Sequence, residues 1–239
     1  MENRYLKVET YLEEFDKFEH GEVFANVDKP YEAFKRFRDY VTTRASMADG
    51  DYSKVKMEKT VYITGDVVIG EGTEISHNVV IQGPVIIGKN CKIQTGALIR
   101  PYTVLGNEVI IGHSAEVKES VVLDKAKLQT FTFTGNSIIG EGARIGSGTI
   151  VSNRRFDQKN IGIKIDGKYY DFGVDFCGCI LGDYARLGAN CTVYPGALIG
   201  AYSWVMPMTP VKGVIEHQKI VEYKEGKYSY RDKERTKLK

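Results

Sequence analysis

The 239-residue sequence contains no long apolar run: nowhere do about 18 consecutive apolar residues occur, which argues against a transmembrane helix. Its N-terminal stretch, MENRYLKVETYLEEF, lacks the apolar core of a signal peptide. An excess of one charge is also lacking, because 33 Lys and Arg face 31 Asp and Glu, for a formal net charge of +2. This balance argues against nucleic acid or an anionic membrane as the main partner. With 42% hydrophobic residues the composition is that of a globular protein, which we expect in the cytoplasm.

An aliphatic residue recurs every six positions through the middle of the sequence. The series comprises Ile63, Ile69, Ile75, Ile81, Ile87, Ile93, Ile99, Leu105, Ile111, Val117 and Leu123. Two positions before each member lies a small or β-branched residue, from Val61 to Val121. Residues two apart point to the same face of a strand, so each hexad predicts a short strand with two inward side chains. Gly often follows the aliphatic residue, as at Gly70 and Gly88, where the chain can turn.

Strands this short bury little surface alone, but the stacked turns of a coil cover one another. Three hexads make one triangular turn of 18 residues, with successive turns about 4.8 Å apart. The period returns at Ile139, Ile145 and Val151, and again from Leu181 to Val205. The sequence therefore predicts a mainly β protein, a parallel β-helix of hexapeptide repeats.

The period breaks in the stretch LQTFTFTGNS, residues 128–137. Only sixteen positions separate Leu123 from Ile139, where eighteen would keep the phase of the coil. The period alone leaves open whether this break is a defect of the repeat or a site.

Three other segments flank or interrupt the coil, which we assign to residues 59–212. Residues 1–58 have apolar spacings of three and four and predict a helical N-terminal segment with two helices. An insert, residues 152–178, contains two alternating runs around Asp166 and Gly167 and predicts a protruding β-hairpin. Residues 213–239 form a basic C-terminal tail, which we expect to be a solvated end.

Cysteine and histidine are scarce, with four residues of each. Cys91, Cys179 and Cys191 occupy the small inward position, where a free thiol acts as a compact hydrophobe, so CGC at 177–179 is weak evidence for a metal or redox site. His77 and His113 are 36 positions apart, two turns up one column, too far to share a metal ion. With only His20 and His217 besides, a metal-dependent hexapeptide protein of the carbonic-anhydrase type is disfavoured, and no metal is required.

Arg100 and Lys118 both follow an inward aliphatic residue and lie 18 positions apart, so they should stand in one column. Like charges this close repel unless an anion or carboxylates lie between them. Spacing alone leaves two interpretations open: a site for an anionic ligand such as a phosphate, or two charges that fan into solvent.

The stretch LIRPYTVLGNEVIIGHSAEVKESVVLDKAKLQTFTFTGNSIIGEGARIGSGTIVSN, with its GSGTIVSN motif, carries a family resemblance. It resembles the acetyltransferase half of the bifunctional glucosamine-1-phosphate acetyltransferase/N-acetylglucosamine-1-phosphate uridylyltransferase and its archaeal sugar-phosphate relatives. The likeness covers roughly residues 60–207 and includes the break of phase, which implies that a site is built there. It implies a left-handed β-helix, a homotrimer with active sites between subunits, and acetyl-CoA or another acyl-CoA as co-substrate. Residues 1–58 show no Gly-rich nucleotide-binding signature of the uridylyltransferase half.

The resemblance also implies roles for individual residues. Arg100 and Lys118 fall on the sugar-phosphate-binding arginine and lysine. Arg144 stands where the family has a sugar-contacting asparagine. At the acyl-donor site the resemblance places Asn153, Arg154 (where a tyrosine is common), Lys159 and Ala189.

The catalytic position departs from the family. Thr130 stands where a histidine takes the proton from the sugar amine, and Phe133 stands where a tyrosine helps to hold the substrate phosphate. A threonine hydroxyl does not titrate near neutral pH, and phenylalanine has no donor.

Three functions therefore compete. The first is an acyl-CoA-dependent acyltransferase acting on a sugar phosphate or nucleotide sugar, with His113 as a substitute base. The second is a non-catalytic protein that binds such sugars, and Thr130 and Phe133 favour it. The third is a trimeric scaffold that presents the hairpin at residues 161–172 to a partner. We favour the first, because the predicted donor-side and anion-side residues are present together.

Overall fold

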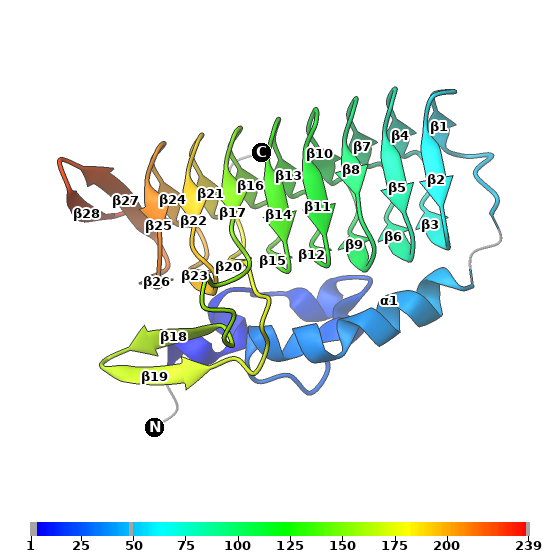
Figure 1. Ribbon diagram of the computed structural model, residues 1–239. Coiled ribbons are helices and arrows are strands. Elements are labelled where there is room, and N and C mark those ends of the chain that lie inside the picture. The colour runs from blue at the N-terminus through cyan, green and yellow to red at the C-terminus, as the bar shows by residue number, and fades with distance from the viewer. Residues whose placement is uncertain (1–3, 48–49, 238–239) are drawn as a thin grey trace.

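The computed structural model describes residues 4–47 and 50–237, and its main feature is a coil of short parallel strands (Figure 1). The strands form three sheets, which are the three sides of a prism. Sheet A consists of β1 (Lys56–Met57), β4 (Glu74–Ile75), β7 (Lys92–Ile93), β10 (Ile110–Ile111), β13 (Lys127–Leu128), β16 (Arg144–Ile145), β21 (Arg186–Leu187), β24 (Trp204–Val205), β27 (Lys219–Lys224) and β28 (Lys227–Asp232). Sheet B consists of β2 (Tyr62–Thr64), β5 (Val80–Gln82), β8 (Leu98–Ile99), β11 (Glu116–Lys118), β14 (Phe133–Gly135), β17 (Ile150–Val151), β22 (Thr192–Val193) and β25 (Pro210–Val211). Sheet C consists of β3 (Val67–Ile69), β6 (Val85–Ile87), β9 (Thr103–Leu105), β12 (Val121–Val122), β15 (Ile138–Ile139), β20 (Cys179–Leu181), β23 (Ala197–Ile199) and β26 (Val214–Ile215).

The register between successive rungs, each rung being one circuit of the coil, confirms the predicted period. Tyr62 pairs with Val80, eighteen positions on, and the same step recurs from β20 to β23. The inward aliphatic and small residues form one continuous core along the axis of the coil. This core consists largely of the hexad positions that the sequence pattern predicted to point inward. Each rung covers the apolar residues of the next, so a short repeat can fold.

The phase of the coil changes at two places, one before the predicted break and one within it. Val117 and Val122 are both in the coil core, five positions apart, whereas Val121 and Leu123 face outward against the N-terminal segment. The step from Thr134 to Ile139 is also five positions and not six. The rungs in this region are therefore 17 residues long. The assignment of Val121 and Leu123 as inward residues was therefore wrong. Three consecutive aliphatic residues, 121–123, made the phase ambiguous in the sequence.

The stretch 128–137 keeps the six-residue step from Leu128 to Thr134, and the second shortened step begins at Thr134. Leu128 and the fully buried Thr134 occupy successive inward positions, and Phe133 lies on the outer face of sheet B. The hydroxyl of Thr134 is buried without a hydrogen-bond partner among the described residues. A threonine in an aliphatic position is what hid the continuing period.

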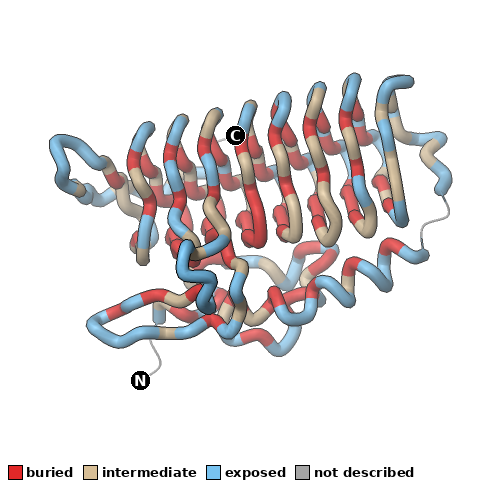
Figure 2. Tube along the Cα trace, in the orientation of Figure 1, coloured by how far each residue is buried: buried red, intermediate tan, exposed pale blue. Residues whose placement is uncertain are grey.

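The N-terminal segment covers the outer face of sheet C (Figure 1). It contains the α-helix α1 (Phe37–Ala45) and the 3-10 turns Arg4–Leu6, Val8–Thr10, Phe15–Lys17, Gly21–Phe24 and Pro30–Lys35, where the sequence predicted two helices. Its buried side chains form a second core with outward residues of sheet C such as Val104, Ile138 and Ile180. Figure 2 shows the buried residues along the coil and along the inner side of this segment. One face of the prism is therefore closed to ligands.

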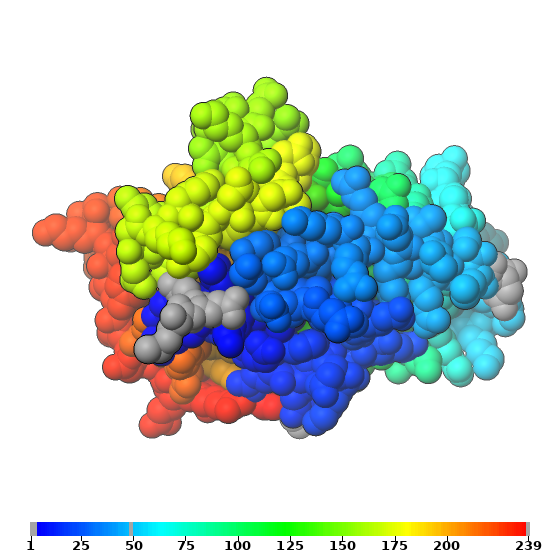
Figure 3. All heavy atoms as spheres, turned by 90° about the horizontal axis from the view of Figure 1, so that it is seen from below, coloured from blue at the N-terminus to red at the C-terminus, as the bar shows by residue number. Residues whose placement is uncertain are grey.

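The insert and the C-terminal end add two hairpins. The predicted hairpin of the insert is present as β18 (Gly162–Ile165) and β19 (Lys168–Asp171), and the ring of Phe172 stacks on Tyr31 at 3.9 Å. Figure 3 shows the insert beside the N-terminal segment on this face of the molecule. At the other end, β27 and β28 form a hairpin that extends sheet A. The last described residues, 233–237, run back along the edge of sheet A, where three of their cations lie over aromatic rings of the coil.

Candidate functional site

The corner between sheets A and B stacks one residue of each rung into a column. The carbonyl oxygen of each member accepts from the backbone N–H of the residue that follows the next member. Examples are Phe131 N to His113 O (2.9 Å) and Gly148 N to Thr130 O (3.0 Å). His113 therefore lies one rung from Thr130, the position where the resemblance places the base. We call this set the A–B corner column; its members are His77, Thr95, His113, Thr130, Ser147 and Ala189.

The imidazole of His113 is held in one orientation. Its Nδ1 lies 2.7 Å from the carbonyl oxygen of Thr95, and since a carbonyl only accepts, Nδ1 carries the hydrogen. Nε2 then carries the lone pair, 3.3 Å from the Ser114 hydroxyl. The ring of Phe131 meets the imidazole edge to face at 5.2 Å. In its neutral form, an imidazole held in this way presents the Nε2 lone pair that a general base needs.

The ends of the sheet B strands bring Arg100 and Lys118 together, as the 18-residue spacing predicted. Ile99 pairs with Val117, so the two cations are neighbours on adjacent rungs. Carboxylates accompany both: Arg100 donates to Glu116 at 2.8 Å, and Lys118 Nζ lies 3.9 Å from Glu119. The repulsion that the spacing implied is thus reduced within the chain. The Lys118 side chain is only 17% exposed and does not extend into solvent, whereas the Arg100 side chain is 40% exposed.

A hydrogen-bonded chain of side chains starts at the N-terminal helix and ends at Asn153. Arg38 of α1 forms an ion pair with Glu119, and the same carboxylate oxygen accepts from Asn136 Nδ2 at 3.0 Å. Asn136 Oδ1 accepts from Asn153 Nδ2 at 2.7 Å. A carboxylate can only accept, so it fixes the orientation of both amides and turns Asn153 Oδ1 away from Asn136 as an acceptor. The side chain that the resemblance places at the donor site is therefore preoriented.

The ring of Phe176 lies beside this chain of side chains. Arg154 stacks on the ring at 4.8 Å and Lys118 lies 5.4 Å from its centre. Phe176, Glu119 and Arg38 could not be predicted from the sequence. Phe176 and Glu119 belong to no sequence motif. Arg38 belongs to the N-terminal segment, which lies outside the hexapeptide repeat.

The structure does not gather all predicted site residues into one place. Arg100, Lys118, Asn153 and Arg154 lie at the sheet B–sheet C corner, whereas Ala189 belongs to the A–B corner column. Arg144 lies on sheet A, in register with Lys127 and Arg186. Lys159 lies in the insert, exposed, with its backbone N–H 3.4 Å from Asp157. Phe133, on the outer face of sheet B, lies between the two corners.

The cysteines and the remaining histidines do not form a centre of their own. Burial raises the pKa of Cys91 to about 11 and that of Cys179 to about 12, so both thiols stay protonated at neutral pH. His20 is buried against Tyr40, and burial lowers its pKa. Across residues 4–47 and 50–237 no group of three or more His, Cys, Asp or Glu side chains could hold a metal ion. In the same part of the chain, no helix is long and apolar enough to cross a bilayer.

The architecture defines a class: the protein is a left-handed β-helix built from hexapeptide repeats. The UDP-N-acetylglucosamine acyltransferase of Francisella novicida shares this fold, with a TM-score of 0.58 at 17% sequence identity over 75% of this chain and 67% of that chain. Within the class, residues 81–224 match the family described as the GMPPB C-terminal domain, and the chain belongs to that family.

Curated relatives confirm the resemblance seen in the sequence. The bifunctional sugar-1-phosphate nucleotidylyltransferase/acetyltransferase of Sulfurisphaera tokodaii is 40% identical over 151 residues, which are 63% of this chain and 38% of that protein. The bifunctional protein GlmU of Methanococcus maripaludis is 41% identical over 170 residues, which are 71% of this chain and 41% of that protein. The chain thus spans about two fifths of the length of these relatives.

Proposed function

We propose that this chain is an acyl-CoA-dependent acyltransferase that acts on an amino or hydroxyl group of a sugar phosphate or nucleotide sugar. The observation that carries the proposal is the orientation of His113, one rung from Thr130, with Nδ1 bonded to Thr95 and Nε2 available. The names of the relatives, which include acetyltransferases of sugar phosphates, support the reaction class.

His113 would accept the proton of the acceptor amine or hydroxyl as that group attacks the thioester carbonyl. The new C–N or C–O bond forms, the C–S bond breaks, and the departing thiolate takes the proton from His113 to leave free CoA. The Nδ1–H bond to the Thr95 carbonyl, at 2.7 Å, would stabilise the imidazolium between these steps. Asn153 Oδ1 would accept from an N–H group of the acyl donor, because Asn136 already holds its amide nitrogen.

Acetyl-CoA binding tests the donor side of the proposal. Calorimetry is expected to show binding to the native protein, and Asn153→Ala is expected to weaken it about 10-fold, the effect of losing one well-oriented hydrogen bond. Ser152→Ala, next to Asn153, is the matched control and should bind as the native protein does. An absence of binding at millimolar acetyl-CoA would contradict the proposal.

Failure of that test would favour the second candidate, a non-catalytic protein that binds sugar phosphates or nucleotide sugars. The observation behind it is that Thr130 and Phe133 stand where the resemblance has a titrating histidine and a donating tyrosine. The retained pair Arg100 and Lys118 would then bind the phosphate without turnover. The scaffold hypothesis is weaker, because Ile163 and Ile165 of the hairpin are buried in the core with the N-terminal segment.

We further propose that three copies assemble with sheet B facing a neighbouring copy. The outer face of sheet B carries exposed apolar residues, among them Tyr62 at 62% and Ile150 at 43% exposure, whereas the N-terminal segment covers sheet C. Light scattering is expected to give three times 26.8 kDa, or about 80 kDa. Ile150→Asp should lower this mass, whereas Lys164→Asp on the hairpin should not. A native mass of 26.8 kDa would contradict the assembly.

A further inference from the structure

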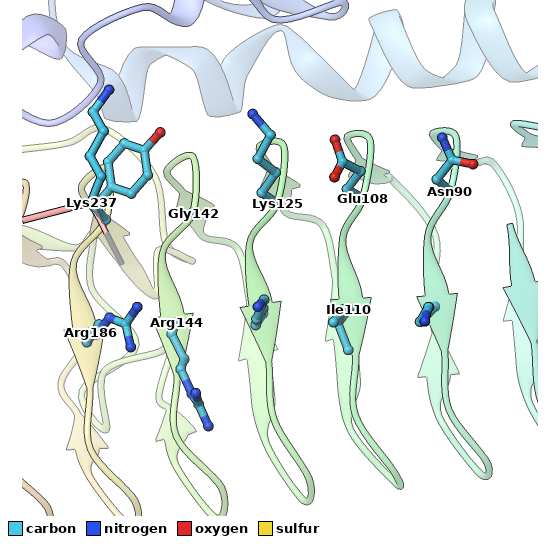
Figure 4. A pocket seen from close by; sticks show the side chains of 11 residues that line it. Asn90, Glu108, Ile110, Lys125, Gly142, Arg144, Arg186 and Lys237 are labelled. Carbon is cyan, nitrogen blue, oxygen red and sulfur yellow. The ribbon is translucent and has the colours of Figure 1, made fainter. Parts of the chain in front are cut away.

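A groove of about 680 Å³ lies along the outer face of sheet A, at the corner toward sheet C (Figure 4). We call it the sheet A groove. Six cations line it: Lys92, Lys125, Lys127, Arg144, Arg186 and Lys237. Glu108 is the carboxylate among its lining residues. Its volume lies in the range of pockets that hold ligands of nucleotide size, roughly 300–1,000 Å³.

The register places three of these cations on consecutive rungs. Lys127 pairs with Arg144, and Arg144 pairs with Arg186, so their backbones are about 4.8 Å apart. Burial and the neighbouring Arg144 lower the pKa of Arg186, which indicates that these like charges act on one another. Lys125 has its own partner, Glu141, at 3.0 Å. Across the part of the chain that the structure describes, neither Lys127 nor Arg144 has a carboxylate within salt-bridge distance.

The C-terminal tail contributes Lys237 to the lining of the groove. Every second residue of the tail lies over an aromatic ring: Lys233 over Trp204 at 4.5 Å, Arg235 over Tyr202 at 4.5 Å and Lys237 over Tyr184 at 4.9 Å. Cation–π contacts of this kind each contribute about 0.5–1 kcal/mol at exposed sites. Arg235 is also paired with Glu13, so the charge that the tail adds to the groove is that of Lys237, beside five other cations. Like charges gathered in this way favour the binding of an anion.

We propose that the sheet A groove binds the diphosphate of a nucleotide. Three cations at the rung spacing can each share phosphate oxygens with a neighbour, and the guanidinium of Arg144 can bind two oxygens at once. A single phosphate group would not span the three rungs that carry this row. The biological role of such a ligand rests on the proposed acyltransferase function. The positive charge of the groove does not depend on that function.

Two sources supply the same chemistry, and the tests distinguish them. The diphosphate can belong to the acceptor, as in a nucleoside diphosphate sugar, or to the acyl donor, because CoA also carries one. The probes are inorganic pyrophosphate, UDP-N-acetylglucosamine, acetyl-CoA and glucosamine 1-phosphate, measured by calorimetry at low salt, where charge interactions are least screened.

The variant is Lys127→Gln with Arg144→Gln, and its matched control is Lys164→Gln with Lys168→Gln on the exposed hairpin of the insert. Pyrophosphate binding is expected to weaken about 10-fold or more in the variant and to stay unchanged in the control. Circular dichroism and the melting temperature establish that both proteins fold. Weaker binding of UDP-N-acetylglucosamine but not of acetyl-CoA assigns the groove to the acceptor, and the reverse assigns it to the donor.

Equal binding of all four probes by the native protein and the variant would overturn the inference, as would a loss of affinity confined to glucosamine 1-phosphate. Variant-sensitive binding of pyrophosphate in a protein that does not bind acetyl-CoA would support the groove while contradicting the proposed acyltransferase. The two proposals can therefore fail separately.

Discussion

Replacing His113 with Gln is expected to lower the rate of acyl transfer by about 10²- to 10⁴-fold, the usual contribution of a general base. Gln can still donate to the Thr95 carbonyl, 2.7 Å from Nδ1 in the native protein, so the corner of the coil should stay intact. What Gln lacks is a nitrogen that can take up a proton. The measurement is thiol release from acetyl-CoA with the acceptor that reacts fastest in a panel of amino-sugar phosphates and UDP-amino sugars.

The column offers a matched control. His77 lies two rungs below His113, with Nδ1 3.2 Å from Thr60 and Nε2 3.6 Å from Glu58. His77→Gln should leave both the rate and acetyl-CoA binding unchanged. A native rate in His113→Gln would exclude His113 as the base.

A second substitution separates a chemical role from a structural one. Thr130 stacks directly on His113, so Thr130→His in the His113→Gln background places an imidazole one rung away, at the position where the resemblance has its histidine. Recovery of a substantial part of the lost rate is expected, because the requirement is for a titrating nitrogen at this corner. A merely structural role of His113 would give no recovery.

The coil was predictable because its information is local. A period of six with inward residues such as Ile81 and Ile99 specifies strand, corner and stacking at once, and the register confirms it. The break of phase was predicted, but the place of its first shortened step was not, because Val121, Val122 and Leu123 are all aliphatic. Which of them points inward is decided by the N-terminal segment, more than 70 positions away, which buries Val121 and Leu123 from outside.

The candidate site was predictable only where the rung spacing determines it. The adjacency of Arg100 and Lys118 follows from the 18-residue step, and so does the column that holds His77 and His113. Side-chain partners across the corner do not follow from the step. Glu119 links Asn136 to Arg38, a residue of α1 that no repeat pattern could place beside it.

The N-terminal segment therefore helps to fix side-chain positions on the coil. A substitution of Asp183 can test how strongly the segment and the coil stabilise each other. Asp183 is 4% exposed. Its carboxylate accepts hydrogen bonds from the backbone N–H of Glu13 in the N-terminal segment and of Glu141 in the coil, each at 2.7 Å. The backbone N–H of Asp183 donates to Tyr11 O at 2.9 Å. One side chain thus joins the segment to a rung of sheet C.

Asp183→Ala is expected to lower the free energy of unfolding by about 2–3 kcal/mol at pH 5, because two buried N–H groups lose their acceptor. Burial raises the pKa of Asp183 from 3.8 to about 7 in the folded protein. The folded state therefore keeps a proton that the unfolded chain releases between pH 4 and 7, and the contribution of Asp183 to stability falls as the pH rises through that window. The difference between the native protein and the variant should shrink from pH 5 to pH 8, by at most about 1.4 kcal/mol per pH unit below pH 7. Urea unfolding at both pH values measures this, with the exposed Asp16→Ala as the control. A difference that grows with pH would show that the carboxylate is held ionised and that its two N–H bonds outweigh its burial.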